Sequence, residues 1–192
     1  MVDITGHVAF GLLFALPAWQ FWTGRTSVAF VAIAAVSSLL PDVDLWLAVL
    51  FPEEVHHHGV THTVVFVTCA ALVGGVIIAG LFAERFDDWT GSEEFGRRRL
   101  FLFSFLGVLA GGLAHVFADM LSAPDVSTPI EPLWPFVDGS WGIDLVWYNA
   151  RWINVGFLAV MVVVALTVNV VPTSEARVWD PPSPFETENG GE

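Results

Sequence analysis

The histidines of this chain and several of its aspartates gather in four short segments, around His7, Asp42 and Asp44, 56–62, and His115 and Asp119. Imidazole and carboxylate groups together form a ligand set suited to zinc, manganese or iron. His115 and Asp119 are four residues apart, which places both on one face of a helix. Pro41 weakens helical hydrogen bonding just before two aspartates, so the backbone can open where the carboxylates are needed. In chain order the candidate residues are His7, Asp42, Asp44, His56, His57, His58, His62, His115 and Asp119.

Each segment also has an ordinary structural interpretation. His7 alone would more often be a polar residue at the level of the lipid headgroups, and Asp42 alone would cap an unwound helix. The histidine run at 56–58 would fit a solvated loop, and His115 with Asp119 would fit a buried hydrogen-bonded pair. Four such sets together, with no Lys or Arg nearby to neutralise them, favour a bound cation. The other acidic loop residues are expected to be solvated, namely Glu53, Glu54, Asp125 and Asp138.

The composition is that of a membrane protein. Of 192 residues, 55% are hydrophobic and 14% are charged, whereas roughly a quarter of the residues of an ordinary soluble domain are charged. The net charge is −13, from 20 Asp plus Glu against 7 basic residues that are all arginine, and this disfavours a nucleic acid partner. This acidic, lysine-free balance resembles that of proteins from salt-loving archaea, in which salt screens the self-repulsion. Cys69 is the single cysteine, which excludes an intrachain disulfide and a cysteine-based zinc site.

The elements that must position the candidate residues are apolar segments near the length that a bilayer core requires. We expect an all-α polytopic membrane helix bundle of about five spans, with the N-terminus outside and the C-terminus cytoplasmic. The expected spans are Ile4–Trp22, Ser27–Leu50, Thr63–Ala83, Leu100–Leu121 and Trp152–Val171. Among the arginines, only Arg151 lies in the loops on the N-terminal side, and the others lie on the opposite side. Cytoplasmic loops carry an excess of basic residues, so the opposite side is expected to be cytoplasmic. With spans in alternating direction, all four His/Asp segments fall at the N-terminal side.

Residues 1–171 are expected to form the transmembrane helical domain, with the His/Asp site at its outer end. Residues 172–192 are rich in proline and acidic residues and too poor in apolar residues to pack, so we expect an acidic, disordered cytoplasmic tail. The 122–151 loop carries several aromatic residues and can lie in the membrane interface as a lid or bind a partner. The glycine pairs at 74–75 and 111–112 indicate close helix packing rather than a phosphate-binding loop.

Four segments carry motifs in a definite order: Gly6-His7, Leu39-Leu40-Pro41-Asp42-Val43-Asp44, His57-His58-Gly59-Val60-Thr61-His62-Thr63 and Gly112-Leu113-Ala114-His115-Val116-Phe117-Ala118-Asp119-Met120-Leu121-Ser122. They resemble the motifs of the YdjM-like family of membrane-bound metal-dependent hydrolases, and Leu133-Trp134-Pro135-Phe136 resembles the segment that follows them. The resemblance covers residues 6–136 and implies a helical membrane fold, His and Asp metal ligands and a hydrolytic activity. The ligands that it implies are His7, Asp42, Asp44, His57, His62, His115 and Asp119. The third motif of the family usually reads His-Arg-Gly, and His58 stands here in place of that arginine, so a planar bidentate anion clamp is lost.

These observations predict metal-dependent hydrolysis at the outer leaflet of the membrane. The candidate ligands exceed the three that a single catalytic zinc commonly takes from protein, so two ions bridged by Asp42 or Asp119 would use the whole set. We expect a divalent transition metal, zinc before manganese or iron, that activates water against an ester, and a lipid or lipid-linked ester fits a site at headgroup depth. Asp44 is a candidate general base or a positioning residue. His58 or Arg151 is the candidate for binding an anionic part of the substrate.

Two functions without hydrolysis remain as alternatives. A divalent-metal transporter or sensor would use the helix break at Pro41 as its uptake site, but no second set of ionisable residues follows toward the other side of the membrane. A structural metal site would hold the bundle together while the 122–151 loop binds a partner. Other hydrolase classes are disfavoured, because the chain contains no His-Glu-x-x-His, Gly-x-Ser-x-Gly or P-loop motif.

Overall fold

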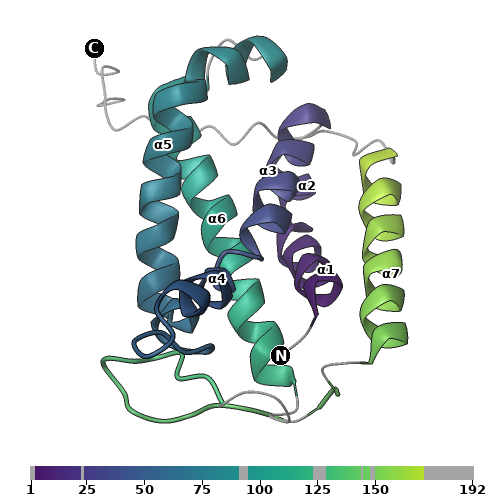
Figure 1. Cartoon of the computed structure of the whole chain (residues 1–192). Coiled ribbons are helices and arrows are strands. Elements are labelled where there is room, and N and C mark those ends of the chain that lie inside the picture. Colours follow the sequence, from purple (N-terminus) through teal and green to yellow (C-terminus); the bar gives the residue numbers. More distant parts are fainter. Residues whose placement is uncertain are drawn as a thin grey trace, which may run out of the picture.

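The computed structural model describes residues 3–22, 24–90, 95–122, 129–143, 145–147 and 150–170, and these are almost entirely helical. The elements are α1 (Ile4–Ala15), α2 (Ala18–Phe21), α3 (Gly24–Ser37), α4 (Val43–Leu50), the short 3-10 helix η1 (Val60–His62), α5 (Val64–Thr90), α6 (Gly96–Leu121) and α7 (Arg151–Val170) (Figure 1). In this part of the chain, β pairing is limited to isolated bridges. The tail at 172–192 lies outside the described residues.

The bundle contains long apolar helices, as the composition predicts. Within the described ranges, four stretches are long and apolar enough to cross a bilayer: Ile4–Phe21, Val64–Thr90, Gly96–Leu121 and Arg151–Val168. Helix α3 is apolar but shorter. Helix α5 has 27 residues and is therefore about 40 Å long at 1.5 Å per residue, which exceeds the roughly 30 Å of a hydrocarbon core. The chain is a multi-pass helical membrane protein.

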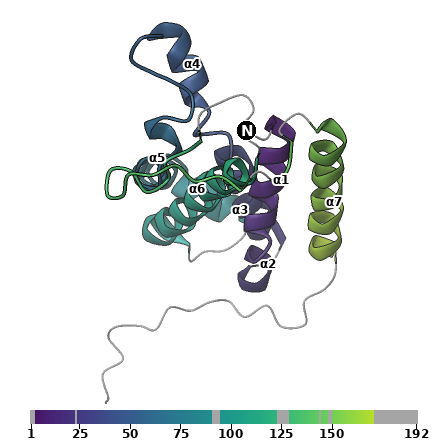
Figure 2. The same ribbon diagram turned by 90° about the horizontal axis from the view of Figure 1, so that it is seen from below.

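The predicted second span, Ser27–Leu50, is wrong as a single helix. Helix α3 ends at Ser37, and tight turns follow in which the N–H of Leu39 donates to the carbonyl of Val36 (3.2 Å) and the N–H of Leu40 donates to that of Ser37 (3.1 Å). Pro41 accounts for the break, since its ring removes an N–H donor and disfavours helical geometry at the residue before it. The chain resumes as α4, which points away from the bundle instead of continuing across the membrane (Figure 2).

Helix α6 is the centre of the bundle. It packs against α5, α3 and α1, and α7 packs against α1 at the edge (Figures 1 and 2). Glycines permit this close approach: a Cβ on Gly111 would collide with the carbonyl oxygen of Ala34, and one on Gly112 would lie 2.5 Å from the side chain of Val67. Small residues at such positions let helix backbones pack closely. The expectation that the glycine pair at 111–112 serves packing is confirmed.

Four parts of the chain meet at one end of the bundle, drawn at the bottom of Figure 1. They are the start of α1, the turn between α3 and α4, the start of α5 and the end of α6. The start of α1 is fixed by Asp3, whose Oδ1 accepts a hydrogen bond from the N–H of Gly6 (2.9 Å), because a side-chain acceptor satisfies an N–H group that the first helical turn leaves open.

The described part of the 122–151 loop is attached to this same end. The N–H of Val64, at the start of α5, donates to the carbonyl of Pro132 (2.9 Å). The N–H of Ile143 donates to the carbonyl of Met120 (2.7 Å), close to the end of α6. Ile130 is buried against Val67 and packs with the α6 side. Backbone hydrogen bonds and one apolar anchor therefore hold the loop beside the histidine-rich segments.

Candidate metal centre

The structure brings the proposed ligands and catalytic residues into one place. Helix α1 supplies one histidine, the α3–α4 turn and α4 supply two aspartates, the connection to α5 supplies three histidines, and α6 supplies a histidine and an aspartate. We call this group the His/Asp cluster. Its members are His7, Asp42, Asp44, His57, His58, His62, His115 and Asp119.

Helix α6 presents its two cluster residues with defined geometry. His115 and Asp119 are buried, and His115 Nε2 lies 3.0 Å from Asp119 Oδ2, as expected of residues four apart on a helix. The other ring nitrogen of His115, Nδ1, donates to the carbonyl of Ser38 (2.6 Å). Because a carbonyl only accepts, Nδ1 of His115 carries a proton, and Nε2 is the ring nitrogen that faces the cluster. A metal-binding imidazole needs this arrangement.

His62 faces His115 across the cluster. It is fully buried, and its Nε2 lies 3.1 Å from His115 Nε2 and 3.4 Å from Asp119 Oδ2. Two nitrogens that bind one tetrahedral zinc at about 2.0–2.1 Å are separated by about 3.3 Å. The observed separation of these two nitrogens is therefore compatible with a shared cation.

Asp44 holds the histidine-rich connection together. Its Oδ1 accepts from His57 Nδ1 (3.0 Å), and its Oδ2 accepts from the hydroxyl of Thr61 (2.8 Å) and from the backbone N–H of His58 (3.2 Å). The Nδ1 atom of His62 also lies 3.2 Å from Oδ2. Both oxygens of this buried carboxylate are thus engaged by the histidine-rich connection.

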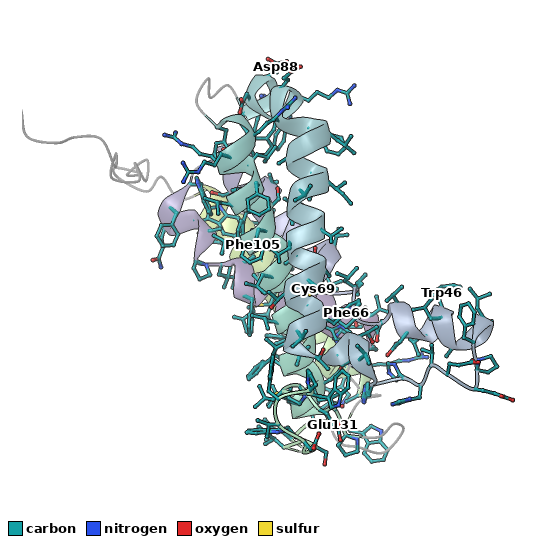
Figure 3. All side chains as sticks on the ribbon, turned by 90° about the vertical axis from the view of Figure 1, so that its left-hand side faces the viewer. Trp46, Phe66, Cys69, Asp88, Phe105 and Glu131 are labelled. Carbon is teal, nitrogen blue, oxygen red and sulfur yellow. The ribbon has the colours of Figure 1, made fainter. Side chains whose placement is uncertain are left out.

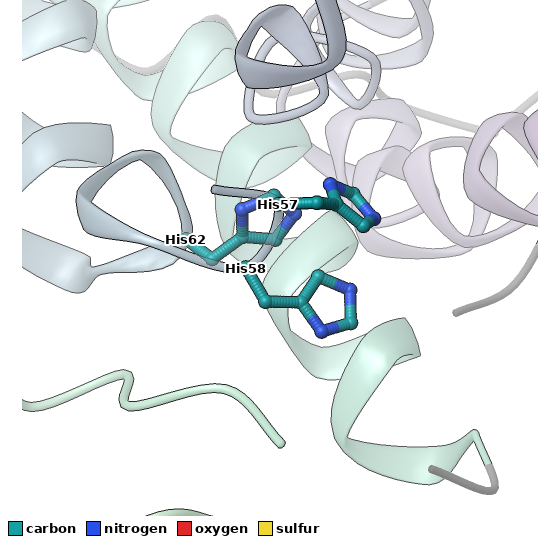
Figure 4. Close-up of side chains that lie close together, drawn as sticks. All are labelled: His57, His58 and His62. Atoms are coloured by element: carbon teal, nitrogen blue, oxygen red, sulfur yellow. The ribbon is translucent and has the colours of Figure 1, made fainter. Parts of the chain in front are cut away.

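The three histidines of the connection converge from one short stretch (Figure 4). His57 and His62 rings lie edge to face, with centroids 5.2 Å apart. His58 is buried and has a positive φ of 66°, a conformation uncommon for any residue with a side chain. This conformation turns its imidazole into the cluster, where Nε2 lies 3.8 Å from Asp119 Oδ2. A non-glycine residue held in this region marks a position that the surrounding structure determines.

His7 is a buried histidine whose ring nitrogens lack hydrogen-bond partners among the described residues, which makes it the clearest candidate for a metal ligand. It is fully buried, and neither of its ring nitrogens has a hydrogen-bond partner in the described part of the chain. Its ring stacks on His115 with centroids 3.8 Å apart, and its Nε2 lies 3.6 Å from Asp119 Oδ1. One oxygen of Asp42 is also buried without a hydrogen bond from the described residues. Leaving such groups unsatisfied costs about 1–3 kcal/mol each, and a cation between them would remove that cost.

The aspartates at the α3–α4 turn are held in their charged form. Burial alone would raise the pKa of the Asp44 carboxyl, but hydrogen bonds from His57 and His62 outweigh it and keep the pKa well below its usual value. Burial also opposes ionisation of Asp42, and the neighbouring His62 and His115 imidazoles lower its pKa nonetheless. Deprotonated carboxylates are the form that binds a metal ion.

The pKa of His62 is shifted upward, because the same aspartates surround its ring. Burial alone would lower its pKa, but the carboxylates of Asp119, Asp42 and Asp44 surround the ring and raise the pKa to about 10. Without a metal, the proton of His62 partly offsets the negative charge of the three aspartates. In the described part of the chain, the basic groups identified beside these carboxylates are imidazoles. Three carboxylates with imidazole neighbours form an environment that favours a bound cation.

Three sets of side chains have donor atoms that lie within 4.8 Å of one another and could hold a metal ion. One set is fully buried and comes from α1 and α6: His7, His115 and Asp119. The second, around the histidine-rich connection, contains Asp42, Asp44, His57 and His62, and the third contains His57, His58 and His62. Two histidines with one carboxylate, as in the buried set, match the number of protein ligands of a typical catalytic zinc. The donor set fits the divalent transition metal that the sequence predicts.

Sequence reasoning separated most of the cluster from other polar residues, but it wrongly included His56 among the candidates and missed two partners. His56 is exposed and lies outside the cluster, and Glu53, Glu54 and Asp138 are exposed. Asp125 lies outside the described residues. Thr61 and the backbone carbonyl of Ser38 orient cluster side chains and were not predicted. The position of Thr61 between the histidines was the available signal for it, whereas a backbone carbonyl leaves no signal in residue type.

The family comparison agrees with the geometry. A family model described as "YdjM inner membrane protein" matches residues 1–179. No curated protein and no solved structure is significantly similar to the chain.

Proposed function

The chain belongs to the YdjM inner membrane protein family, and from this premise and the cluster geometry we propose that it is a membrane-bound metal-dependent hydrolase. The proposed substrate is an ester of a lipid or of a lipid-linked molecule. The proposed cofactor is one or two divalent transition metal ions, zinc before manganese or iron. The proposed ligands are His7, Asp42, Asp44, His57, His62, His115 and Asp119.

One observation carries this proposal. His7 is fully buried at one end of a membrane bundle, and both its ring nitrogens lack hydrogen bonds from the described residues. The stacked neighbour His115 has its proton held on the opposite nitrogen by the Ser38 carbonyl. Ionisable groups inside membrane proteins are costly and by default mark a functional site. A bound metal ion explains why both imidazoles are kept there in this form.

A metal ion in such a site supplies a Lewis acid that polarises an ester and lowers the pKa of water toward neutrality. The side chains of the chain itself perform the other tasks. Asp44 holds His57 and His62 in place through the hydrogen bonds at its two oxygens. His58 occupies the position of the family's arginine, and its buried ring beside Asp119 is proposed to bind an anionic part of the substrate when protonated. Because histidine lacks the planar fork of a guanidinium, a substrate whose anionic group does not need two parallel hydrogen bonds is favoured.

The test is turnover of chemically defined esters by purified protein in mixed micelles. A phospholipid, a soluble phosphoester and a soluble carboxylic ester should be compared with wild type, His115→Ala and His56→Ala. We expect hydrolysis by wild type, at least 100-fold less by His115→Ala, and unchanged hydrolysis by His56→Ala, because only His115 belongs to the cluster. Equal turnover by wild type and His115→Ala would contradict the proposal.

A structural metal site is the second candidate, favoured by the complete burial of His7 and His115. A structural site needs no access for substrate. In that case the metal would raise the thermal stability of the protein without turnover of any ester. The same panel of substrates, combined with thermal unfolding with and without metal, separates the two functions.

A further inference from the structure

Helix α4 has an apolar surface that the bundle does not cover. Its sequence is Val-Asp-Leu-Trp-Leu-Ala-Val-Leu, and Trp46, Val49 and Leu50 are 76%, 78% and 69% exposed. Figure 3 shows α4 projecting sideways from the bundle, at a large angle to α5, with Trp46 on its outer side. Leu45 and Phe51 add to the exposed apolar surface. An apolar helix of this kind requires a nonpolar partner.

The length of α4 excludes a transmembrane role for this helix. Its 8 residues give about 12 Å of helix, far less than the roughly 30 Å hydrocarbon core. Carboxylates also lie near both of its ends: Asp44 in its first turn, and the exposed Glu53 and Glu54 just after it. Asp44 is held inside the protein, and the exposed glutamates at the other end are costly to bury in hydrocarbon, so an axis along the membrane surface suits this helix better than one across it.

The exposed face of α4 adjoins the surface that faces lipid. In Figure 3, α4 leaves the bundle beside the part of α5 that carries Phe66 and Cys69. Helix α5 is a candidate membrane span, and its Val65, Leu72 and Val76 are exposed. Bilayer lipid already covers that surface in a membrane protein. The same lipid is therefore the nearest nonpolar partner for the outer side of α4.

We propose that α4 is an interfacial helix that lies in the headgroup region of the bilayer and buries Trp46, Val49 and Leu50 among the upper acyl chains. Helices with apolar faces bury them about 5–10 Å into the boundary between headgroups and acyl chains, and Trp is typical of this level. The N-terminal end of α4 carries Asp44, which accepts hydrogen bonds from the histidine-rich connection. Lipid contact thereby fixes the depth of one side of the His/Asp cluster. This inference holds whether or not the cluster hydrolyses esters.

The test measures depth in the membrane and requires no activity. Single cysteines at Val49, Glu53 and Leu72 are introduced in a Cys69→Ser background, nitroxide-labelled, and reconstituted in phosphatidylcholine/phosphatidylglycerol vesicles. Collision of each label with oxygen, which concentrates in lipid, is compared with collision with a water-soluble nickel chelate. We expect the label at Leu72 to collide mainly with oxygen and the label at Glu53 to collide mainly with the nickel chelate. The label at Val49 should fall between these two and collide more with oxygen than with nickel. A Val49 label as accessible to nickel as the Glu53 label would overturn the proposal.

A second copy of the chain is the alternative occupant, and the same samples detect it. Contact between copies would bring two Val49 labels together and broaden the nitroxide spectrum, and dilution with unlabelled protein would remove the broadening. Such broadening, in a Val49 label that does not collide preferentially with oxygen, would also overturn the proposal. A Trp46→Gln/Val49→Gln variant with the label at Leu50 provides the converse test. If lipid holds α4, accessibility to nickel at Leu50 should rise several-fold relative to the same label in the otherwise unchanged chain. No change would contradict a lipid-held helix.

Discussion

The imidazole rings of His7 and His115 stack face to face, with centroids 3.8 Å apart and an interplanar angle of 12°. The two rings come from α1 and α6, which pack against each other, and both are fully buried. Only His115 has a hydrogen bond that fixes its proton. The stack therefore places a second imidazole, without hydrogen bonds from the described residues, beside one whose Nε2 faces the cluster.

Replacing His7 with Phe keeps the stacked ring and removes the two nitrogens. We expect the metal-free variant to be as stable as wild type or more stable, since leaving buried polar atoms unsatisfied costs about 1–3 kcal/mol. Added zinc should raise the Tm of wild type but not that of His7→Phe. Thermal unfolding in detergent, with chelator or zinc, measures both effects. The prediction fails if zinc stabilises His7→Phe as much as it stabilises wild type.

Replacing Gly111 with Ala should disturb the site through the backbone. The new Cβ would collide with the carbonyl oxygen of Ala34 and the backbone nitrogen of Ser38, which moves the Ser38 carbonyl away from His115. We expect a loss of about 1–3 kcal/mol of stability, typical of overpacking, and weaker metal binding. Gly80→Ala is the matched control, because a Cβ there meets nothing within 4 Å. Similar Tm and metal affinity in the two variants would argue against this role of Gly111.

Acid should destabilise the metal-free protein through Asp44. Its pKa is lower in the folded protein than in the unfolded chain, so its contribution to stability is present above the unfolded pKa of about 3.9 and is lost as the pH falls through the folded pKa. Asp44→Asn removes this contribution. We expect the variant to have a lower Tm at neutral pH and a smaller further decrease below about pH 4. Parallel curves of Tm against pH for the two proteins would refute this assignment.

Alkali should destabilise the metal-free protein through His62. Its pKa is raised to about 10, so its contribution is complete below the unfolded pKa of about 6.5 and is lost as the pH rises toward about 10. His62→Gln should lack this alkaline decline in Tm. Bound metal should also abolish it, because a metal-bound imidazole nitrogen carries no proton. A decline of equal size in wild type and His62→Gln would show that another group is responsible.

The orientation predicted from the arginine distribution is also testable. Val60 is exposed near the cluster, and Asp88 is exposed at the opposite end of the bundle (Figure 3). In a Cys69→Ser background, a membrane-impermeant thiol reagent added to intact cells should label Val60→Cys and not Asp88→Cys. Labelling of Asp88→Cys alone would reverse the orientation.

Much of the site follows from sequence because membrane spans alternate in direction. Once apolar segments such as the one ending at Leu121 are recognised, alternation places His7 and His115 at the same end of the bundle. The break after Ser37 was harder to predict, because the residues of α4 are as apolar as those of a span. Pro41 indicated where the helix weakens but not that the chain would leave the bundle. The tautomer of His115 was unpredictable, since it depends on a backbone carbonyl that α3 brings near only after packing.

The most direct test of the account is metal content, measured by mass spectrometry on detergent-purified protein. Wild type, His115→Ala and His56→Ala should be compared after identical purification, because one histidine lies in the cluster and the other is exposed outside it. We expect one or two equivalents of a divalent transition metal in wild type and in His56→Ala, and almost none in His115→Ala. Equal metal content in all three proteins, or none in wild type even after incubation with zinc, would contradict a metal centre at the His/Asp cluster.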